Sequence, residues 1–107
     1  MGKLLEQSCV AKPKKLDDSR IERLLTELDD WVLVEGPKIT RTIRTNDFTS
    51  ALGLVNRIGD LAEEEDHHPE ITFTWGKVTV SLNTHSVGGL SENDFILAAK
   101  IDRLVRS

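Results

Sequence analysis

Three segments of the chain carry apolar residues at the three- and four-residue spacing of an amphipathic helix. The first begins near Asp17, the second follows Thr45 or Asn46 as the expected N-cap, and the third begins at Ser91. The apolar positions are Ile21, Leu24, Leu25 and Leu28 in the first; Phe48, Leu52, Val55, Ile58 and Leu61 or Ala62 in the second; and Phe95, Ala98, Ile101, Leu104 and Val105 in the third. We therefore predict three helices, each with one buried face.

Four shorter segments have the pattern of strands. Residues 31–34 and 38–44 are separated by Glu-Gly-Pro, which is typical of a turn. Residues 70–83 alternate between apolar and polar side chains around Gly76, which predicts a hairpin with Gly76 in the first position of a type II′ turn. The resulting order, αββαββα, predicts an α+β fold in which helices pack on one face of a four-stranded antiparallel sheet.

The chain has 107 residues, which is enough for one hydrophobic core and too few for two. Residues 1–16 have no stable period and are expected to form a flexible N-terminal arm, and residues 17–107 a single domain. The arm carries a small basic cluster at Lys12, Lys14 and Lys15. The simplest interpretation is that these charged side chains keep the arm solvated.

Composition narrows the classes of function. The formal net charge of −4 argues against nucleic acid as a direct partner, since phosphate binding depends on clustered Lys and Arg. No apolar run approaches the roughly 18 residues of a membrane helix, so no membrane association is expected. The one cysteine, Cys9, cannot form an internal disulfide, and the N-terminus has no signal-peptide pattern, so we expect a cytoplasmic protein.

All three histidines of the chain lie between residues 67 and 85. A hairpin with Gly76 and Lys77 as its turn pairs Trp75 with Val78, and if the ladder continues it places His68 opposite His85, with Cβ atoms about 4.5–5.5 Å apart. Imidazoles gathered in this way can both give and take protons near neutral pH. The plainer alternative is that the histidines are surface or capping residues.

Two other interpretations concern the acidic residues nearby. Three histidines with Glu63, Asp66 or Asp94 could form a metal site, but adjacent histidines in an extended segment point to opposite faces and the common zinc spacings are absent. We therefore expect no metal. Ser91 and Asp94 form the S-x-x-D pattern of a capping box, so Asp94 has a structural explanation as well as a possible role in a site.

The residues around the histidines resemble the motif of the pterin-4a-carbinolamine dehydratases, also known as the dimerisation cofactor family. That motif has an acidic residue, His-His-Pro, an aromatic residue, a further His and a later Asp. The matching positions here are Glu63, His67, His68, Pro69, Trp75, His85 and Asp94. The resemblance covers about residues 18 to 105 and includes Trp31 and the segments NDFTSAL, GGLSENDF and LAAKID.

The resemblance implies dehydration of 4a-hydroxytetrahydrobiopterin to quinonoid dihydropterin, which recycles the pterin of aromatic amino acid hydroxylases without a metal or redox cofactor. It implies that His67, His68 and His85 are the catalytic imidazoles. The residues that it implies for substrate binding or orientation are Glu63, Asp66, Asn83, Thr84 and Asp94. It also implies a homodimer or homotetramer, with a hydroxylase as a candidate partner. The alternative function is a dimerisation or coactivator module with a vestigial pterin site.

Overall fold

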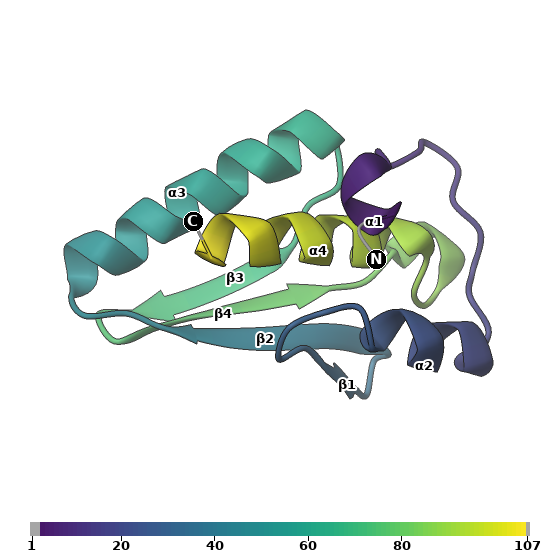
Figure 1. Cartoon of the computed structure of the whole chain (residues 1–107), viewed down its shortest axis with the longest axis horizontal. Helices are drawn as coiled ribbons and strands as arrows, with labels where there is room; N and C mark the ends of the chain where they lie inside the picture. The colour runs from purple at the N-terminus through teal and green to yellow at the C-terminus, as the bar shows by residue number, and fades with distance from the viewer. Residues whose placement is uncertain (1–2, 107) are drawn as a thin grey trace.

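The computed structural model describes residues 3–106 and has an α+β fold (Figure 1). The predicted order of elements is present, with two short elements added, the helix α1 and the 3-10 turn η1. The elements are α1 (Lys3–Glu6), α2 (Asp18–Leu25), β1 (Val32–Val34), β2 (Lys38–Arg44), α3 (Phe48–Glu65), β3 (Glu70–Thr74), β4 (Lys77–Leu82), η1 (His85–Val87) and α4 (Glu92–Arg106). Among the described residues, no helix combines the length and the apolar character that crossing a membrane requires.

The four strands form one antiparallel sheet in the order β1-β2-β4-β3. Helices α3 and α4 lie over one face of this sheet, while α2 lies near the end where β2 begins (Figure 1). The buried apolar side chains of the two central strands are Ile39, Ile43, Val78, Val80 and Leu82. The other face is mainly polar, apart from the exposed Val32 of the edge strand β1, and Thr40 and Ser81 share a hydrogen bond of 2.9 Å across it. The predicted arrangement of helices on one face of the sheet is therefore confirmed.

The register of the β3–β4 hairpin differs from the predicted one by two residues. Thr74 pairs with Lys77, so Trp75 and Gly76 form the turn and Gly76 takes its second position. The alternating pattern could not distinguish the two registers, because a shift by two leaves every side chain on the same face. Hydrogen bonds from Thr45 to the carbonyl oxygens of Trp75 (2.8 Å) and Gly76 (3.0 Å) stabilise the observed turn.

This register also removes the predicted pairing of two histidines. The β3–β4 ladder ends at Glu70 and Ser81, so His68 does not lie opposite His85 in the sheet. Continuing the observed register outward would instead bring His68 towards Asn83. The prediction was wrong because it rested on the position of the turn.

Helix ends follow ordinary capping chemistry, with one correction. Asp47, not Thr45 or Asn46, caps α3 by accepting a hydrogen bond of 2.7 Å from the Ser50 N–H. That N–H lowers the pKa of the Asp47 carboxyl group. At the start of α4, Asp94 accepts the Ser91 N–H at 3.0 Å, which confirms the capping contact predicted from S-x-x-D.

The arm lies against the domain in this structure. Leu4 in α1 is buried in the core, and the Leu16 N–H donates a 2.8 Å hydrogen bond to the Leu90 carbonyl group. Between them, Cys9 and Val10 contact both α3 and α4. A four-residue helix has no periodicity to recognise in the sequence, so these contacts were not foreseen; the flexibility of the arm in solution stays a prediction.

A buried carboxylate joins α4 to the start of the sheet. Asp102 accepts hydrogen bonds from Trp31 Nε1 (2.7 Å), the Asp29 N–H (2.8 Å) and Arg41 Nη1 (2.5 Å). The Asp102 side chain is 3% exposed, so these three donors replace its hydration. This cluster holds β1 and β2 to α4.

Candidate functional site

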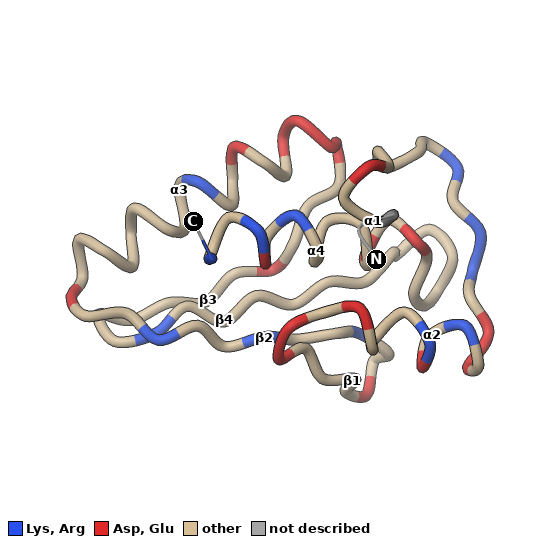
Figure 2. The backbone as a smooth tube through the Cα atoms, viewed as in Figure 1, with Lys and Arg blue, Asp and Glu red and all other residues tan. Residues whose placement is uncertain are grey.

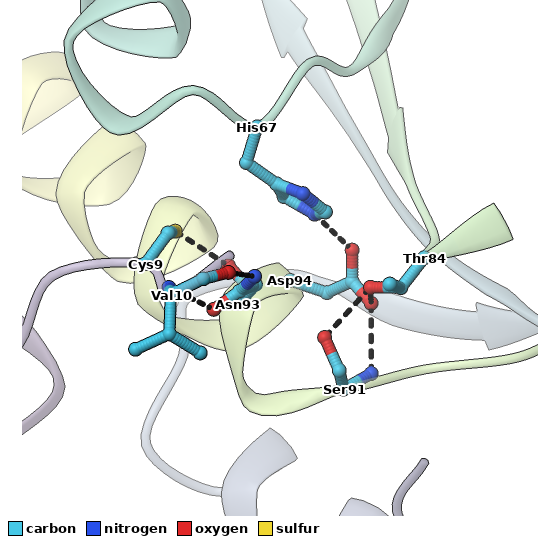
Figure 3. A network of polar contacts seen from close by, with 7 residues as sticks. All are labelled: Cys9, Val10, His67, Thr84, Ser91, Asn93 and Asp94. Carbon is cyan, nitrogen blue, oxygen red and sulfur yellow. Dashed lines mark hydrogen bonds and ion pairs between the residues drawn. The ribbon is translucent and has the colours of Figure 1, made fainter. Parts of the chain in front are cut away.

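The end of α3 directs the first histidine towards α4. Asp66 ends the helix in the left-handed conformation (φ 52°, ψ 42°), and its N–H donates to the carbonyl groups of Ala62 and Glu63. The His67 N–H then donates to the Ala62 carbonyl group at 3.2 Å. This turn leads the chain out of the helix, and the His67 side chain reaches Asp94 near the start of α4 (Figure 3).

His67 and Asp94 form the most buried polar pair among the motif residues. His67 Nε2 lies 2.6 Å from Asp94 Oδ1, and the two side chains are 11% and 0% exposed. Asp94 Oδ2 accepts hydrogen bonds from Thr84 Oγ1 (2.8 Å) and from the Ser91 N–H (3.0 Å), while the Thr84 and Ser91 hydroxyl groups are 2.7 Å apart. These donors fix the orientation of the carboxylate (Figure 3).

The chemistry of this pair follows from its donors and acceptors. An ionised carboxylate only accepts hydrogen bonds, so the proton in the contact sits on His67 Nε2. Nδ1 is then the nitrogen that can exchange a proton with a bound molecule. The same carboxylate would stabilise the imidazolium that forms when Nδ1 takes up a proton.

His68 belongs to a second, more exposed group. Its Nε2 lies 2.5 Å from Glu63 Oε2, and the two side chains are 56% and 77% exposed. His68 also lines a cleft of about 470 Å³ at the ends of the strands, a size suited to a small ligand. The other lining residues are Lys38, Pro69, Glu70, Ser81, Leu82 and Asn83.

His85 lies in the loop between β4 and α4. It follows Thr84, the hydroxyl partner of Asp94, and begins η1 with an exposed side chain. The loop is closed by the Thr84 N–H, which donates to the Gly89 carbonyl group at 2.8 Å, and Gly88 takes the left-handed conformation (φ 66°). This closure fixes the backbone of the loop that carries His85, the residue next to Thr84 in the chain.

The structure therefore places the predicted site residues in two groups with a loop beside them. Thr84, His67 and Asp94 share one hydrogen-bond network, whereas His68 contacts Glu63 and shares its cleft with Asn83. Asp66 shapes the backbone between the two groups, and its side chain is exposed. No cluster of three or more His, Cys, Asp or Glu within residues 3–106 has the arrangement of a metal site.

A charged pair behind the site was not predicted from the sequence. Glu65 Oε2 lies 2.5 Å from Lys100 Nζ, and its Oε1 accepts the Cys9 N–H at 2.8 Å. Burial acts to raise the pKa of Glu65, but the hydrogen bonds from Lys100 and Cys9 outweigh it and lower that pKa. Burial and then the Glu65 carboxylate raise the pKa of the Cys9 thiol to about 12, so Cys9 is no nucleophile at neutral pH. Glu65 lies in the run of acidic residues at the end of α3 (Figure 2). The sequence of this run did not indicate that the side chain of Glu65 would be buried.

Comparison with known proteins identifies the family. The family model described as pterin 4 alpha carbinolamine dehydratase matches residues 14–104. The chain belongs to this family. The resemblance predicted from the histidine motif is thereby confirmed.

Similar dehydratase-family proteins span nearly the whole chain. A Rubrobacter xylanophilus protein named "Putative pterin-4-alpha-carbinolamine dehydratase" is 43% identical over 109 residues, covering 97% of this chain and 100% of its own. A Chlorobium limicola protein of the same name is 45% identical over 108 residues, covering 94% of each chain.

Two solved structures share the dehydratase fold. The Brucella melitensis protein described as a transcriptional coactivator/pterin dehydratase has a TM-score of 0.81 and 35% identity, over 86% of this chain and 99% of its own. A pterin dehydratase-like protein identified as a RuBisCO assembly factor has a TM-score of 0.62 and 20% identity, over 76% of this chain and 95% of its own. The second likeness concerns the fold alone.

Proposed function

We propose that this protein dehydrates 4a-hydroxytetrahydrobiopterin to quinonoid dihydropterin and water. In this reaction the C4a–O bond breaks, N5 loses its proton, and a double bond forms between C4a and N5. The hydroxyl group leaves as water once it receives a proton. The reaction therefore needs one base and one acid that work near neutral pH, and it needs no oxidant, reductant or metal.

The observation that carries this proposal is the 2.6 Å contact between His67 Nε2 and the buried Asp94 carboxylate. It supplies an oriented imidazole of the kind used for general acid–base catalysis. His85, on the loop next to Thr84, is the second proposed proton-transfer group. His68 would act more on binding, with Glu63 orienting its ring.

The other residues that the resemblance implies would bind or orient the pterin ring. Asn83 shares the cleft with His68 and offers both a donor and an acceptor to a heterocycle. Thr84 would act through Asp94, whose carboxylate it orients. Asp66 is proposed at the same edge because it directly precedes the two histidines.

The test is the decay of 4a-hydroxytetrahydropterin, generated by an aromatic amino acid hydroxylase, with and without the protein. We expect acceleration by the wild type, a loss in kcat on the order of 10²-fold or more in His67→Ala or His85→Ala, and mainly a higher KM in His68→Ala. A chelator should leave the rate unchanged. A wild-type rate equal to the spontaneous rate would refute the function, and loss of activity with the chelator would refute the metal-free mechanism.

A second candidate function is supported by exposed apolar side chains at the start of α3 and in the β3–β4 turn. Phe48, Leu52 and Trp75 are 54%, 41% and 68% exposed, and the Phe48 and Phe73 rings are 5.6 Å apart. Such a patch favours protein contact. We propose a second copy of this chain as its occupant, in a homodimer or homotetramer, with the hydroxylase that supplies the substrate as a further partner. A monomer in light scattering at micromolar concentration would contradict the self-association.

A further inference from the structure

The arm contacts the site from behind, through a pair of reciprocal hydrogen bonds. The Val10 N–H donates to Asn93 Oδ1 at 3.0 Å, and Asn93 Nδ2 donates to the Val10 carbonyl group at 2.9 Å. Asn93 is 4% exposed and directly precedes Asp94 (Figure 3). The start of α4 is thereby fixed to the arm at the residue next to Asp94, the partner of His67.

The preceding arm residue makes the matching contact with α3. The Cys9 N–H donates to Glu65 Oε1 at 2.8 Å, and Cys9 Sγ lies 3.5 Å from the Asn93 carbonyl oxygen. Glu65 is the last residue of α3 and stands two positions before His67. Cys9 and Val10 therefore connect the end of α3 with the start of α4.

These two helix ends supply the two partners of the 2.6 Å contact between His67 and Asp94. A hydrogen bond of this length is lost when its groups move apart by about 1 Å. Displacements of that size at a catalytic group can cost as much as 10²-fold in rate. Holding the two helix ends at a fixed separation thus has a direct chemical consequence.

We infer that Asn93 is a positioning residue that works with Cys9 and Val10 of the arm to keep the His67 imidazole on the Asp94 carboxylate. We call these three residues the arm brace. Its effect on rate rests on the proposed dehydratase function. Its effect on the geometry of the His67–Asp94 pair does not.

The full-length chain offers variants that remove the brace and matched ones that keep it. Asn93→Leu replaces the amide by an apolar group of similar size and removes both hydrogen bonds with Val10. Val10→Pro removes the N–H donor and restricts the backbone at positions 9 and 10, while Val10→Ala shortens the same exposed side chain and keeps the donor. Leu4→Ala reduces the packing of α1 in the core and leaves the brace in place.

Two measurements separate positioning from simple stabilisation. We expect kcat to fall about tenfold in Asn93→Leu and several-fold in Val10→Pro, with KM within about twofold, and the double variant should be no slower than Asn93→Leu alone. The NMR signal of the His67 Nε2–H proton should broaden through solvent exchange in both single variants. Val10→Ala should match the wild type, and Leu4→Ala should lower the melting temperature without changing kcat or this signal.

The possible results distinguish failure of the positioning role from failure of the proposed dehydratase function. Unchanged kcat and an unchanged His67 proton signal in Asn93→Leu and Val10→Pro, with a lowered melting temperature alone, would overturn the positioning role. If the wild type shows no dehydration, the proposed function fails, and the NMR comparison still decides whether the arm brace holds the pair. If Asn93→Leu does not fold, Val10→Pro against Val10→Ala gives the same decision.

Discussion

Replacing Asp94 by Asn is the most discriminating change at the site. It keeps the shape of the side chain but puts a hydrogen-bond donor where the wild type has an acceptor for His67. The Asn oxygen can still accept from Thr84 Oγ1 and the Ser91 N–H, as Asp94 Oδ2 does now. Its NH₂ group then faces His67 Nε2, where the carboxylate of Asp94 accepts a hydrogen bond in the wild type. His67 must therefore carry its proton on Nδ1, which is the wrong tautomer for the proposed chemistry.

The size of the effect follows from the three contacts. Hydrogen bonds to an ionised carboxylate contribute about 1.5–3 kcal/mol each and neutral ones about 0.5–1.5 kcal/mol, so replacing three charged ones by neutral ones should cost about 3–4.5 kcal/mol of stability. The effect on kcat should be larger than this effect on stability. Loss of the orienting carboxylate behind a catalytic imidazole lowers kcat on the order of 10²- to 10⁴-fold.

The assay compares kcat and urea unfolding for Asp94→Asn with those for Glu92→Gln. The control makes the same carboxyl-to-amide change two residues earlier in α4, at a part-exposed ion pair with Arg20 (3.3 Å) that should contribute at most about 1 kcal/mol. We expect Glu92→Gln to retain the wild-type kcat. A folded Asp94→Asn variant with a kcat near that of the wild type would refute the role of this carboxylate.

Three further predictions concern the frame around the site. Asp66→Gly should raise the free energy of unfolding by about 0.5–1 kcal/mol in urea titration, because glycine takes the left-handed conformation without strain. If the stabilised variant also has a higher KM, the Asp66 side chain contacts the pterin. Asp102→Ala should cost about 3–5 kcal/mol in the same experiment, because it leaves Arg41 buried without its partner, and a loss below about 1 kcal/mol would contradict this. The lowered pKa of Glu65 stabilises the fold above the unfolded-state pKa of about 4.3, and this contribution is lost as pH falls through the lower folded-state value. The stability difference between the wild type and Glu65→Gln, measured by urea unfolding, should therefore shrink on acidification, and a constant difference would argue against the pair with Lys100.

The sequence predicted those features that depend on side-chain periodicity or on a local motif. The location of α3 is one case, although its buried face was predicted only in part. Ile58 and Ala62 are buried as predicted, but the start of the helix buries Ala51 and Leu54. Phe48 and Leu52, which were predicted on the buried face, are exposed. The capping contact between Ser91 and Asp94 is another, because it joins residues only three positions apart. Local patterns of this kind carry their own geometry, so they can be recognised without a fold.

The sequence did not predict features for which neighbouring residues or registers fit the same pattern, nor contacts made by backbone groups. The sequence prediction named Thr45 or Asn46 as the cap of α3, but the adjacent Asp47 can cap a helix equally well, and the folded loop selects it. Either hairpin register buried the same side chains, so the predicted pairing of His68 with His85 had no independent support. The contacts of the arm were missed because they use backbone groups, which every residue carries.

We propose that His67 and His85 remove water from a pterin carbinolamine. The most direct test of this proposal is the first-order rate of 4a-hydroxytetrahydropterin decay with the wild type and with the His67→Ala, His85→Ala double variant, at equal concentration and with folding checked by circular dichroism. We expect marked acceleration by the wild type and a rate close to the spontaneous one for the folded double variant. Equal acceleration by the two proteins, or none by the wild type, would contradict it.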